Sequence, residues 1–424
     1  MKQAQHRFSS LAFVIGMAGL PVYIHAPKYF VDVYGISLVT MGVIIFLLRL
    51  VDVFQDPILG IIASKTTRFG ALPIALSVVA MCVGMIMLFA IHSPILPSLW
   101  FSISLFLVFS GFSFAYIRSY AQGLINLGAK DQIRLARWRE VGTTLGICVA
   151  AILPTTLLLV SADGYPLFAI FFCLIAILAL MHVWSQFPAS NSSQDSQNSF
   201  SSLLSATRNL QIRNLLFLAL VNSSPVALSS TLFLFFVESR LNAPDWAGIF
   251  LILFFLAAAI ATPLWTKLAD VHGVFKILKI SMLLSIISFF GATFLAEGDG
   301  LIFSAICLLS GATVGADLAL LPVLFARQIE NSSIIPDLGF SLWNFVSKAT
   351  LAFAAVISLP LLELVGFNSS GPNSENALLA LTFGYAVLPC ILKCISIFLL
   401  FKVMRGEVQI CLLYTSDAAD EIAS

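Results

Sequence analysis

The sequence contains few charged residues for its length. Only 10% of its 424 residues are Asp, Glu, Lys or Arg, whereas 59% are hydrophobic. Soluble globular proteins carry roughly 25% charged residues, so a chain of this size could not cover a water-exposed surface with so little charge. The net charge of +1 gives no basis for nucleic-acid binding, which depends on attraction to phosphates. Hydrocarbon is therefore the expected solvent for most of the chain.

The motifs of common catalytic and metal sites are also missing. No HExxH, GxSxG or P-loop pattern occurs in the sequence, and its histidines form no cluster. The seven cysteines include no CxxC pair with a histidine partner, and all but Cys411 lie in apolar stretches. A disulfide framework is therefore not expected. We predict neither an enzyme nor a protein with a resident cofactor.

What the sequence does contain is about twelve apolar segments, each near or above the roughly 20 residues that span a bilayer. Backbone polar groups in lipid must be satisfied within the segment, so these segments are predicted to be helices. They lie near residues 9–30, 37–63, 71–91, 97–124, 141–161, 165–187, 213–237, 246–268, 277–296, 299–327, 338–362 and 376–403. The prediction is an all-α polytopic membrane protein with twelve transmembrane helices.

Basic residues are distributed unequally between alternate loops. If the N-terminus is inside, the inner loops carry most of the lysines and arginines, whereas the outer loops carry only Lys28 and Arg240. Cytoplasmic loops are enriched in Lys and Arg, so both termini are predicted to be cytoplasmic. We expect a multi-pass protein of a bacterial cytoplasmic (inner) membrane, in contact with the lipid bilayer and monomeric.

A polar linker divides the segments six and six. Residues 188–203 are rich in Ser and Asn and lack apolar periodicity, so this segment is not expected to bury enough surface to fold. The predicted division is an N-terminal half at 1–187, a cytoplasmic linker at 188–212 and a C-terminal half at 213–405. Residues 411–424 resemble the translation of a sequencing-library adapter, and we assign them no function.

A weak internal repeat supports two similar halves. The segments Asp56–Ser64 and Thr262–Asp270 end the second and eighth predicted helices, with Pro and Ala in register, and a short basic loop with Gly follows each. Transporters with two repeated halves bind their substrates between them, near the membrane midplane. The repeat therefore predicts a central cavity between the halves.

Three charged residues lie close together in the second predicted helix. Arg49, Asp52 and Asp56 recur at i, i+3 and i+7, so they share one helix face. A charge at the membrane centre costs roughly 2.5–3.5 kcal/mol or more, which makes it a functional candidate. Two carboxylates one turn apart repel unless a cation lies between them, so this face suits a reversible Na⁺ or H⁺ site. A structural ion-pair network is the competing interpretation.

The same segment carries a family resemblance. Residues 49–60, RLVDVFQDPILG, resemble the second-helix signature of the sodium/melibiose symporter-like family, the glycoside–pentoside–hexuronide branch of the major facilitator superfamily. Further similarities extend to about residue 403, including WREVG around Arg139 and WNFVSK ending at Lys348. The resemblance implies the major facilitator fold and cation-coupled symport of a small polar solute, such as a sugar, glycoside or uronate, by alternating access.

The resemblance also implies roles for individual residues. Asp52 and Asp56 would bind the coupling cation, with Na⁺ as the candidate metal ion, and Lys348 would approach them from the opposite half. Arg139 would let the cation and substrate sites communicate. Gating or structural roles are expected for Arg49, Pro57, Gly60 and Asp270. The sequence departs from the family at the first-helix aspartate that holds sugar hydroxyls, because Gly16 aligns with that position, and Ser64 replaces an aspartate of the cytoplasmic gating loop.

Polar residues in other predicted helices are candidates for the substrate site: Tyr23, Tyr116, Arg118, Arg139, Asp317, Trp343 and Asn344. Arg118 suggests an anionic group on the substrate, although pairing with Asp317 or Asp52 is an alternative. Trp343 could stack on a sugar ring or could only pack. The alternative function is transport of a lipid or amphiphile, which would need an apolar lateral opening rather than a closed polar pocket.

Overall fold

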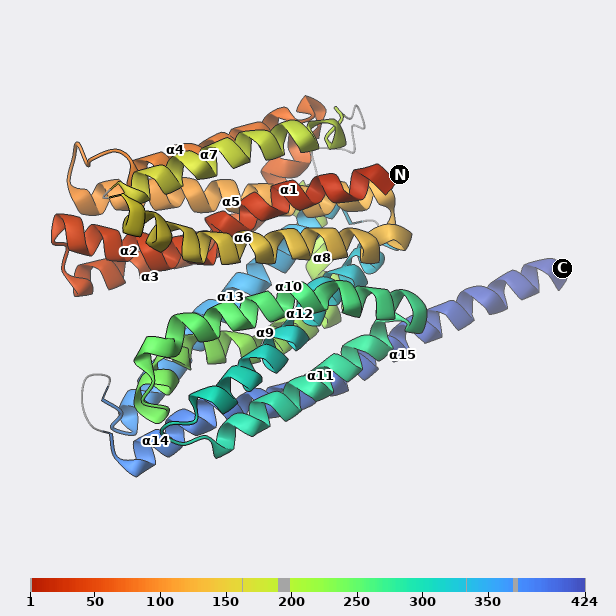
Figure 1. Cartoon of the computed structure of the whole chain (residues 1–424). Coiled ribbons are helices and arrows are strands. Elements are labelled where there is room, and N and C mark those ends of the chain that lie inside the picture. The colour runs from red at the N-terminus through yellow and green to blue at the C-terminus, as the bar shows by residue number, and fades with distance from the viewer. Residues whose placement is uncertain (1, 162, 190–198, 333, 369–372, 424) are drawn as a thin grey trace.

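The structure is a computed structural model that describes residues 2–161, 163–189, 199–332, 334–368 and 373–423. The described residues are helical apart from short connections (Figure 1). Ten of their helices are long and apolar enough to cross a membrane. The twelve-span prediction is completed by α1 and α2, which divide the first span between them, and by α3, which carries four charged residues.

The N-terminal half forms the first bundle. Its helices are α1 (Lys2–Ala18), α2 (Leu20–Tyr34), α3 (Leu38–Lys65), α4 (Leu72–Phe89), α5 (Pro97–Leu127), α6 (Gln132–Val160) and α7 (Gly164–Val183). The C-terminal half begins after α8 (Ser199–Arg208) and contains α9 (Leu210–Phe235), α10 (Ala247–His272), α11 (Val274–Gly291), α12 (Gly300–Glu330), α13 (Pro336–Leu364), α14 (Glu375–Thr382) and α15 (Leu388–Ala423). Together they form two six-span halves, the major facilitator architecture that the sequence predicted.

Local sequence accounts for the main breaks between helices. Gly19 has a non-helical backbone between α1 and α2, and Pro21 follows in the first turn of α2, where a missing N–H costs nothing. The Ser37 side chain caps α3 by accepting a hydrogen bond from Thr40 N, and Asn209 caps α9 in the same way. The first span, predicted as one segment at 9–30, is therefore two helices.

Two further predictions need correction. The polar segment 188–203 was not expected to fold, but α8 covers its last five residues; residues 190–198 lie outside the described ones. Ala206 of α8 is fully buried, so contacts with the bundle stabilise this short helix. The fifth span begins at Gln132 instead of 141. Hydropathy placed its start after a charged stretch, yet Arg139 and Glu140 in that stretch are buried within the protein.

Small residues bring helices close together inside the N-terminal half. A Cβ on Gly16 of α1 would lie 2.1 Å from the backbone oxygen of Thr143 in α6, and a Cβ on Gly146 would lie 2.1 Å from the Phe13 oxygen. Membrane helices use small residues in this way to maximise packing. The two helices therefore meet backbone to backbone, without room for side chains.

The two halves pack on each other through equivalent helices. In one contact α3 packs on α13, and in the other α10 packs on α6, so each helix of the repeated pair, α3 and α10, faces the opposite half. The halves converge at the end that holds the start of α1 and α8, and their ribbons diverge toward the end with α2 and α14 (Figure 1). We call the converging end, which carries most of the basic loops, the basic end.

Candidate functional site

The candidate cation site lies where α3 of the N-terminal half faces α13 of the C-terminal half. Asp52 is 8% exposed and Asp56 is fully buried. Residues four apart lie on one helix face, and here that face is turned away from lipid. Both carboxylates are therefore withdrawn from water and need a positive partner.

Lys348 of α13 supplies that partner from across the interface. Its ammonium nitrogen lies 2.7 Å from Asp52 Oδ1 and 3.1 Å from Asp56 Oδ1. It also donates to the Asp52 backbone oxygen at 3.3 Å and to the Ser113 hydroxyl of α5. One ammonium thus joins two helices of one half to a helix of the other.

Neighbouring polar groups hold the first carboxylate in place. Gln55 Nε2 donates to Asp52 Oδ1 at 2.9 Å, and Ser110 Oγ donates to Gln55 Oε1 at 2.8 Å. Ser113 Oγ donates to the same Asp52 oxygen at 3.3 Å. Supporting bonds of this kind fix the orientation of ligating groups, so the Asp52 oxygen is preorganised toward the position of the ammonium.

The second carboxylate retains an unused oxygen. Asp56 Oδ2 is buried without a hydrogen-bond partner, and such a group normally carries a penalty of about 1–3 kcal/mol. The oxygens around the Lys348 ammonium are two carboxylates, a hydroxyl and a backbone carbonyl, all hard ligands suited to a small hard cation. Among the described residues no group of three or more His, Cys, Asp or Glu could hold a metal, so any ion here would rely on the hydroxyl and carbonyl as well.

Arg118, a predicted substrate residue, forms an ion pair between the halves in this structure. Its Nη1 lies 3.2 Å from both carboxylate oxygens of Asp337 at the start of α13, and both side chains are almost fully buried. Asp317 and Asp52 were the alternative partners expected from the sequence, and neither pairs with Arg118. The reason is position: Arg118 lies nearer the basic end of α5, where Asp337 begins α13.

Arg139 lies in an aromatic and acidic environment. Its guanidinium carbon is 3.1 Å from the centre of the Tyr120 ring, which places a cation on an aromatic face. Its Nε lies 3.4 Å from Glu140 Oε1, which also accepts a 2.6 Å hydrogen bond from the Tyr120 hydroxyl. Tyr116, half-buried, stacks on Tyr120 with ring centres 4.3 Å apart. Arg139 Nη1 is buried without a partner, so one donor remains unused.

Trp343 and Asn344 are neighbouring candidates on α13 that lie in different surroundings. Trp343 is 6% exposed, packs against Phe325 with ring centres 4.9 Å apart, and also interacts through its side chain with Tyr116 of the opposite half. Asn344, the next residue, is buried and its Nδ2 has no hydrogen-bond partner. Arg139 and Asn344 therefore both present unpaired buried donors.

Asp317, another predicted substrate ligand, is paired within the C-terminal half. Its Oδ2 lies 2.5 Å from Nζ of Lys393, a fully buried residue of α15. The same ammonium donates to Asn222 Oδ1 of α9 at 2.8 Å. This triad joins α9, α12 and α15, so the Asp317 charge is neutralised inside one half and does not face the opposite one as an unpaired acid.

The residues expected to gate or shape the site have distinct positions. Asp270 of α10 lies 3.1 Å from Arg137 Nη2 of α6, a partly exposed ion pair between the halves. Gly60 packs so closely on α13 that a Cβ would lie 2.4 Å from Ser341. Pro57 is half-buried inside α3, as is Arg49. The Tyr23 side chain lies outside the described ones.

Comparisons with known proteins agree with this architecture. A family model described as MFS/sugar transport protein matches residues 6–403. The chain belongs to this family. A search of curated proteins finds no match.

Three solved structures of transporters share the fold of this chain. A variant of the Escherichia coli fucose:proton symporter matches with a TM-score of 0.68 and 17% identity, over 92% of this chain and 98% of that one. The human organic anion transporter MFSD10 matches with 0.63 and 16% identity, over 94% and 97%. A bacterial homologue of the iron transporter ferroportin, in an outward-facing state, matches with 0.67 and 12%, over 96% and 100%. At these identities the likeness establishes the fold, and the chain is a membrane transporter by family.

Several residues at these sites were not among the sequence predictions: Lys393, Asp337, Ser113 and Gln55. Lys393 lies within the twelfth predicted span, so the rule that flags intramembrane charges could have found it, whereas Asp337 lies directly before the eleventh predicted span. Ser113 and Gln55 gave no such signal, because neutral polar residues are common in membrane helices. Their roles depend on which helices meet, and one sequence does not contain that information.

Proposed function

We propose that this MFS/sugar transport family member is a secondary active transporter that couples Na⁺ or H⁺ to the symport of a small polar solute, such as a sugar, glycoside or uronate. The observation that supports it is the Lys348 ammonium, which reaches from one half to bond Asp52 and Asp56 of the other. Alternating access moves the halves relative to each other, so a charge shared between them is suited to link cation binding to that movement.

Lys348 acts in this proposal as a tethered cation. While it lies between the two carboxylates, their repulsion is offset without a bound ion, and α13 is tied to α3. Na⁺, or a proton on one carboxylate, would replace the ammonium and release that tie. Because an ion binds only where Lys348 has withdrawn, cation binding and loss of the contact between halves are thermodynamically linked.

The basic end is assigned to the cytoplasm from its Lys and Arg content, in keeping with a bacterial inner membrane. The halves converge at this end through Arg118–Asp337 and Arg137–Asp270, and their ribbons diverge toward the other (Figure 1). On this assignment the protein is closed toward the cytoplasm, and the two ion pairs are the contacts that must part before solute is released inward.

The polar character of the interface supports a polar solute. Arg139 Nη1 and Asn344 Nδ2 are buried donors without partners, and oxygen acceptors of a hydroxyl or carboxylate group would satisfy them. A lipid or amphiphile transporter would need an apolar lateral opening instead. The solute is therefore expected to carry acceptor oxygens, with the aromatic rings of Tyr116 and Tyr120 alongside.

Transport in proteoliposomes tests the proposal. Sugars, glycosides and uronates would be screened for uptake under imposed Na⁺ or H⁺ gradients, with Lys402→Met on the exposed surface of α15 as the control variant. We expect gradient-driven uptake in the wild-type protein and in the control, and its loss in Asp52→Asn/Asp56→Asn. Uptake that ignores both gradients, or full coupling in the double variant, would contradict the proposal.

Distance measurements separately test whether the ion pairs hold the basic end closed. Spin labels at Lys130 and Asn331 would report on the basic end, where α12 contacts the turn at Ala129–Asp131 across the halves. The neutral double variant Arg118→Gln/Asp337→Asn removes the ion pair without leaving a lone buried charge. We expect a shift toward longer distances in this variant. An unchanged distance distribution would mean that the pair does not hold the basic end closed.

A further inference from the structure

A hollow lies away from the interface between the halves, near the basic end of the N-terminal half. It has a volume of about 420 Å³ and lies among α1, α6 and α7. That size falls within the range of ligand sites, roughly 300–1,000 Å³. It shares no lining residue with the cation site or with the predicted substrate residues, so the proposed transport function does not account for it.

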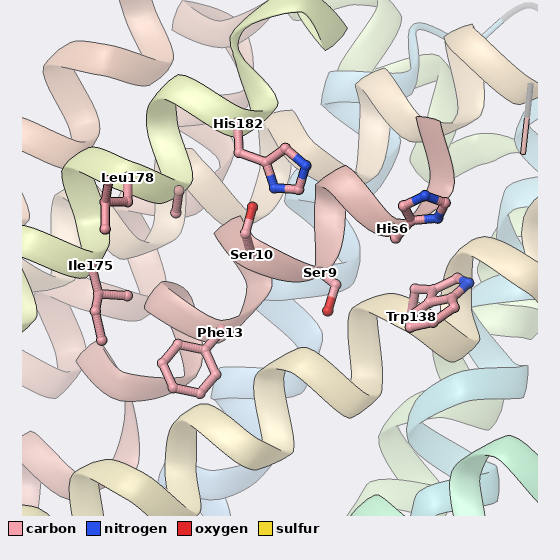
Figure 2. A pocket seen from close by; sticks show the side chains of 9 residues that line it. His6, Ser9, Ser10, Phe13, Trp138, Ile175, Leu178 and His182 are labelled. Atoms are coloured by element: carbon pink, nitrogen blue, oxygen red, sulfur yellow. The ribbon is translucent and has the colours of Figure 1, made fainter. Parts of the chain in front are cut away.

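The lining changes from polar to apolar along the hollow. His6, Ser9, Ser10, Trp138 and His182 gather at one end and Phe13, Ile175 and Leu178 at the other (Figure 2). The rise of 1.5 Å per residue places Phe13 about 10 Å deeper than His6 along the helix. Because α1 and α7 run in opposite directions, Ile175 is also about 10 Å deeper than His182. Along both helices the lining residues therefore change from polar to apolar over the same depth.

Aromatic residues mark the polar end as the level of the membrane surface. Trp138 and Trp184 are 44% and 49% exposed, and tryptophan is enriched where the hydrocarbon meets the headgroups. The His6 ring lies 5.6 Å from the Trp138 ring. A ligand in this hollow would therefore have its polar part among headgroups and its apolar part among acyl chains.

The polar end favours a negatively charged ligand. The lining contains two histidines and no acidic residue. Arg7 flanks it and donates to the Ser185 hydroxyl, which links α1 to the turn after α7. Ser10 Oγ donates to the Arg7 backbone oxygen at 2.8 Å, and the Ser10 side chain points toward His182 in Figure 2. An imidazole N–H can donate a hydrogen bond to a phosphate oxygen.

We propose that this hollow binds an anionic phospholipid from the leaflet at the basic end. His6 and His182 contact the phosphate headgroup, and Phe13, Ile175 and Leu178 contact the first part of an acyl chain. The site holds α1 and α7 together with a lipid and is independent of the cation site. The test of this lipid site is therefore independent of the test of the transport function proposed above.

Native mass spectrometry of the purified full chain with equimolar phosphatidylglycerol and phosphatidylcholine tests the proposal. The wild-type protein is expected to retain phosphatidylglycerol preferentially. His6→Gln/His182→Gln removes both imidazoles from the polar end, and the preference for phosphatidylglycerol should be lost. His272→Gln is the matched control, because His272 is an exposed histidine at the basic end of the other half, and it should leave the preference unchanged.

Two further arms separate lipid binding from binding of a free anion and from loss of the fold. Leu178→Trp fills the apolar end and should reduce retention of both lipids, while inorganic phosphate should not compete because it lacks acyl chains. Thermal unfolding in lipid-free detergent verifies that each variant is folded. Equal retention of both lipids by the wild-type protein, an unchanged preference in the double histidine variant, or full competition by phosphate would each overturn the proposal.

Discussion

Replacing Lys348 with methionine removes the ammonium between Asp52 and Asp56 and leaves the helix intact. The side chains of the three residues are 13%, 10% and 0% exposed, so water can do little to compensate for the loss. Breaking a buried ion pair by removing one partner costs about 3–5 kcal/mol. In cation-free buffer Lys348→Met is therefore expected to unfold at a clearly lower temperature than the wild-type protein.

The same variant should respond more strongly to the coupling ion. In the wild-type protein an ion must displace Lys348 before it binds, which lowers its apparent affinity. Without that competitor, an ion present at about 100 times its Kd stabilises the folded state by about 2.7 kcal/mol. Na⁺ should thus recover a large part of the lost stability if the site takes sodium, and acidification should do so if it takes a proton.

Thermal unfolding in NaCl and in choline chloride at equal ionic strength measures this response. The triple variant Lys348→Met/Asp52→Asn/Asp56→Asn keeps the methionine but removes both carboxylates, so it should show no ion response. The tethered-cation reasoning is refuted if Lys348→Met is as stable as the wild-type protein without cations. It is also refuted if neither Na⁺ nor acid stabilises this variant more than the wild-type protein.

Two other predictions concern packing inside each half. Lys393→Met should destabilise the protein by about 3–5 kcal/mol in chemical or thermal unfolding, because Asp317 becomes a lone buried charge; adding Asp317→Asn should recover part of the loss, and an additive double variant would show that the two do not interact. Gly16→Ala should cost about 1–3 kcal/mol by forcing α1 from α6. Gly248→Ala, whose Cβ meets nothing within 4 Å, should be neutral or stabilising by about 0.5–1 kcal/mol, and equal effects at both glycines would contradict the packing argument.

Gly16 also bears on the predicted resemblance to sodium/melibiose symporter-like proteins, which carry an aspartate at the aligned position. An aspartate at this position would project into the backbone of Thr143, 2.1 Å from where its Cβ would lie. The side chain that holds sugar hydroxyls in those symporters has no room here. Under the proposed function, solute recognition therefore depends on other residues, and Arg139 and Asn344 have unpaired donors available.

The sequence by itself determined the membrane class, the helical fold and the six-plus-six division. Each follows from a local or summed property: apolar length sets the spans, unsatisfied backbone groups require helices, and the polar stretch at 188–203 separates the halves. The sequence also predicted the carboxylate face of α3, since Asp52 and Asp56 are four residues apart on one helix. Hydropathy did not predict the break at Gly19 or the early start of α6, because it averages over single residues and treats every charge as exposed.

Only the tertiary structure decided which charges meet. Asp52 and Lys348 are 296 residues apart, and their contact depends on how α3 packs against α13. Arg118 carries the same charge as Lys348 and lies in an equally apolar helix, yet it pairs with Asp337 near the basic end. A buried charge takes whichever opposite charge the packed helices bring within a few ångströms, because electrostatic attraction in a low dielectric is strong only at close range. That distance is a property of the packed helices and of no single segment.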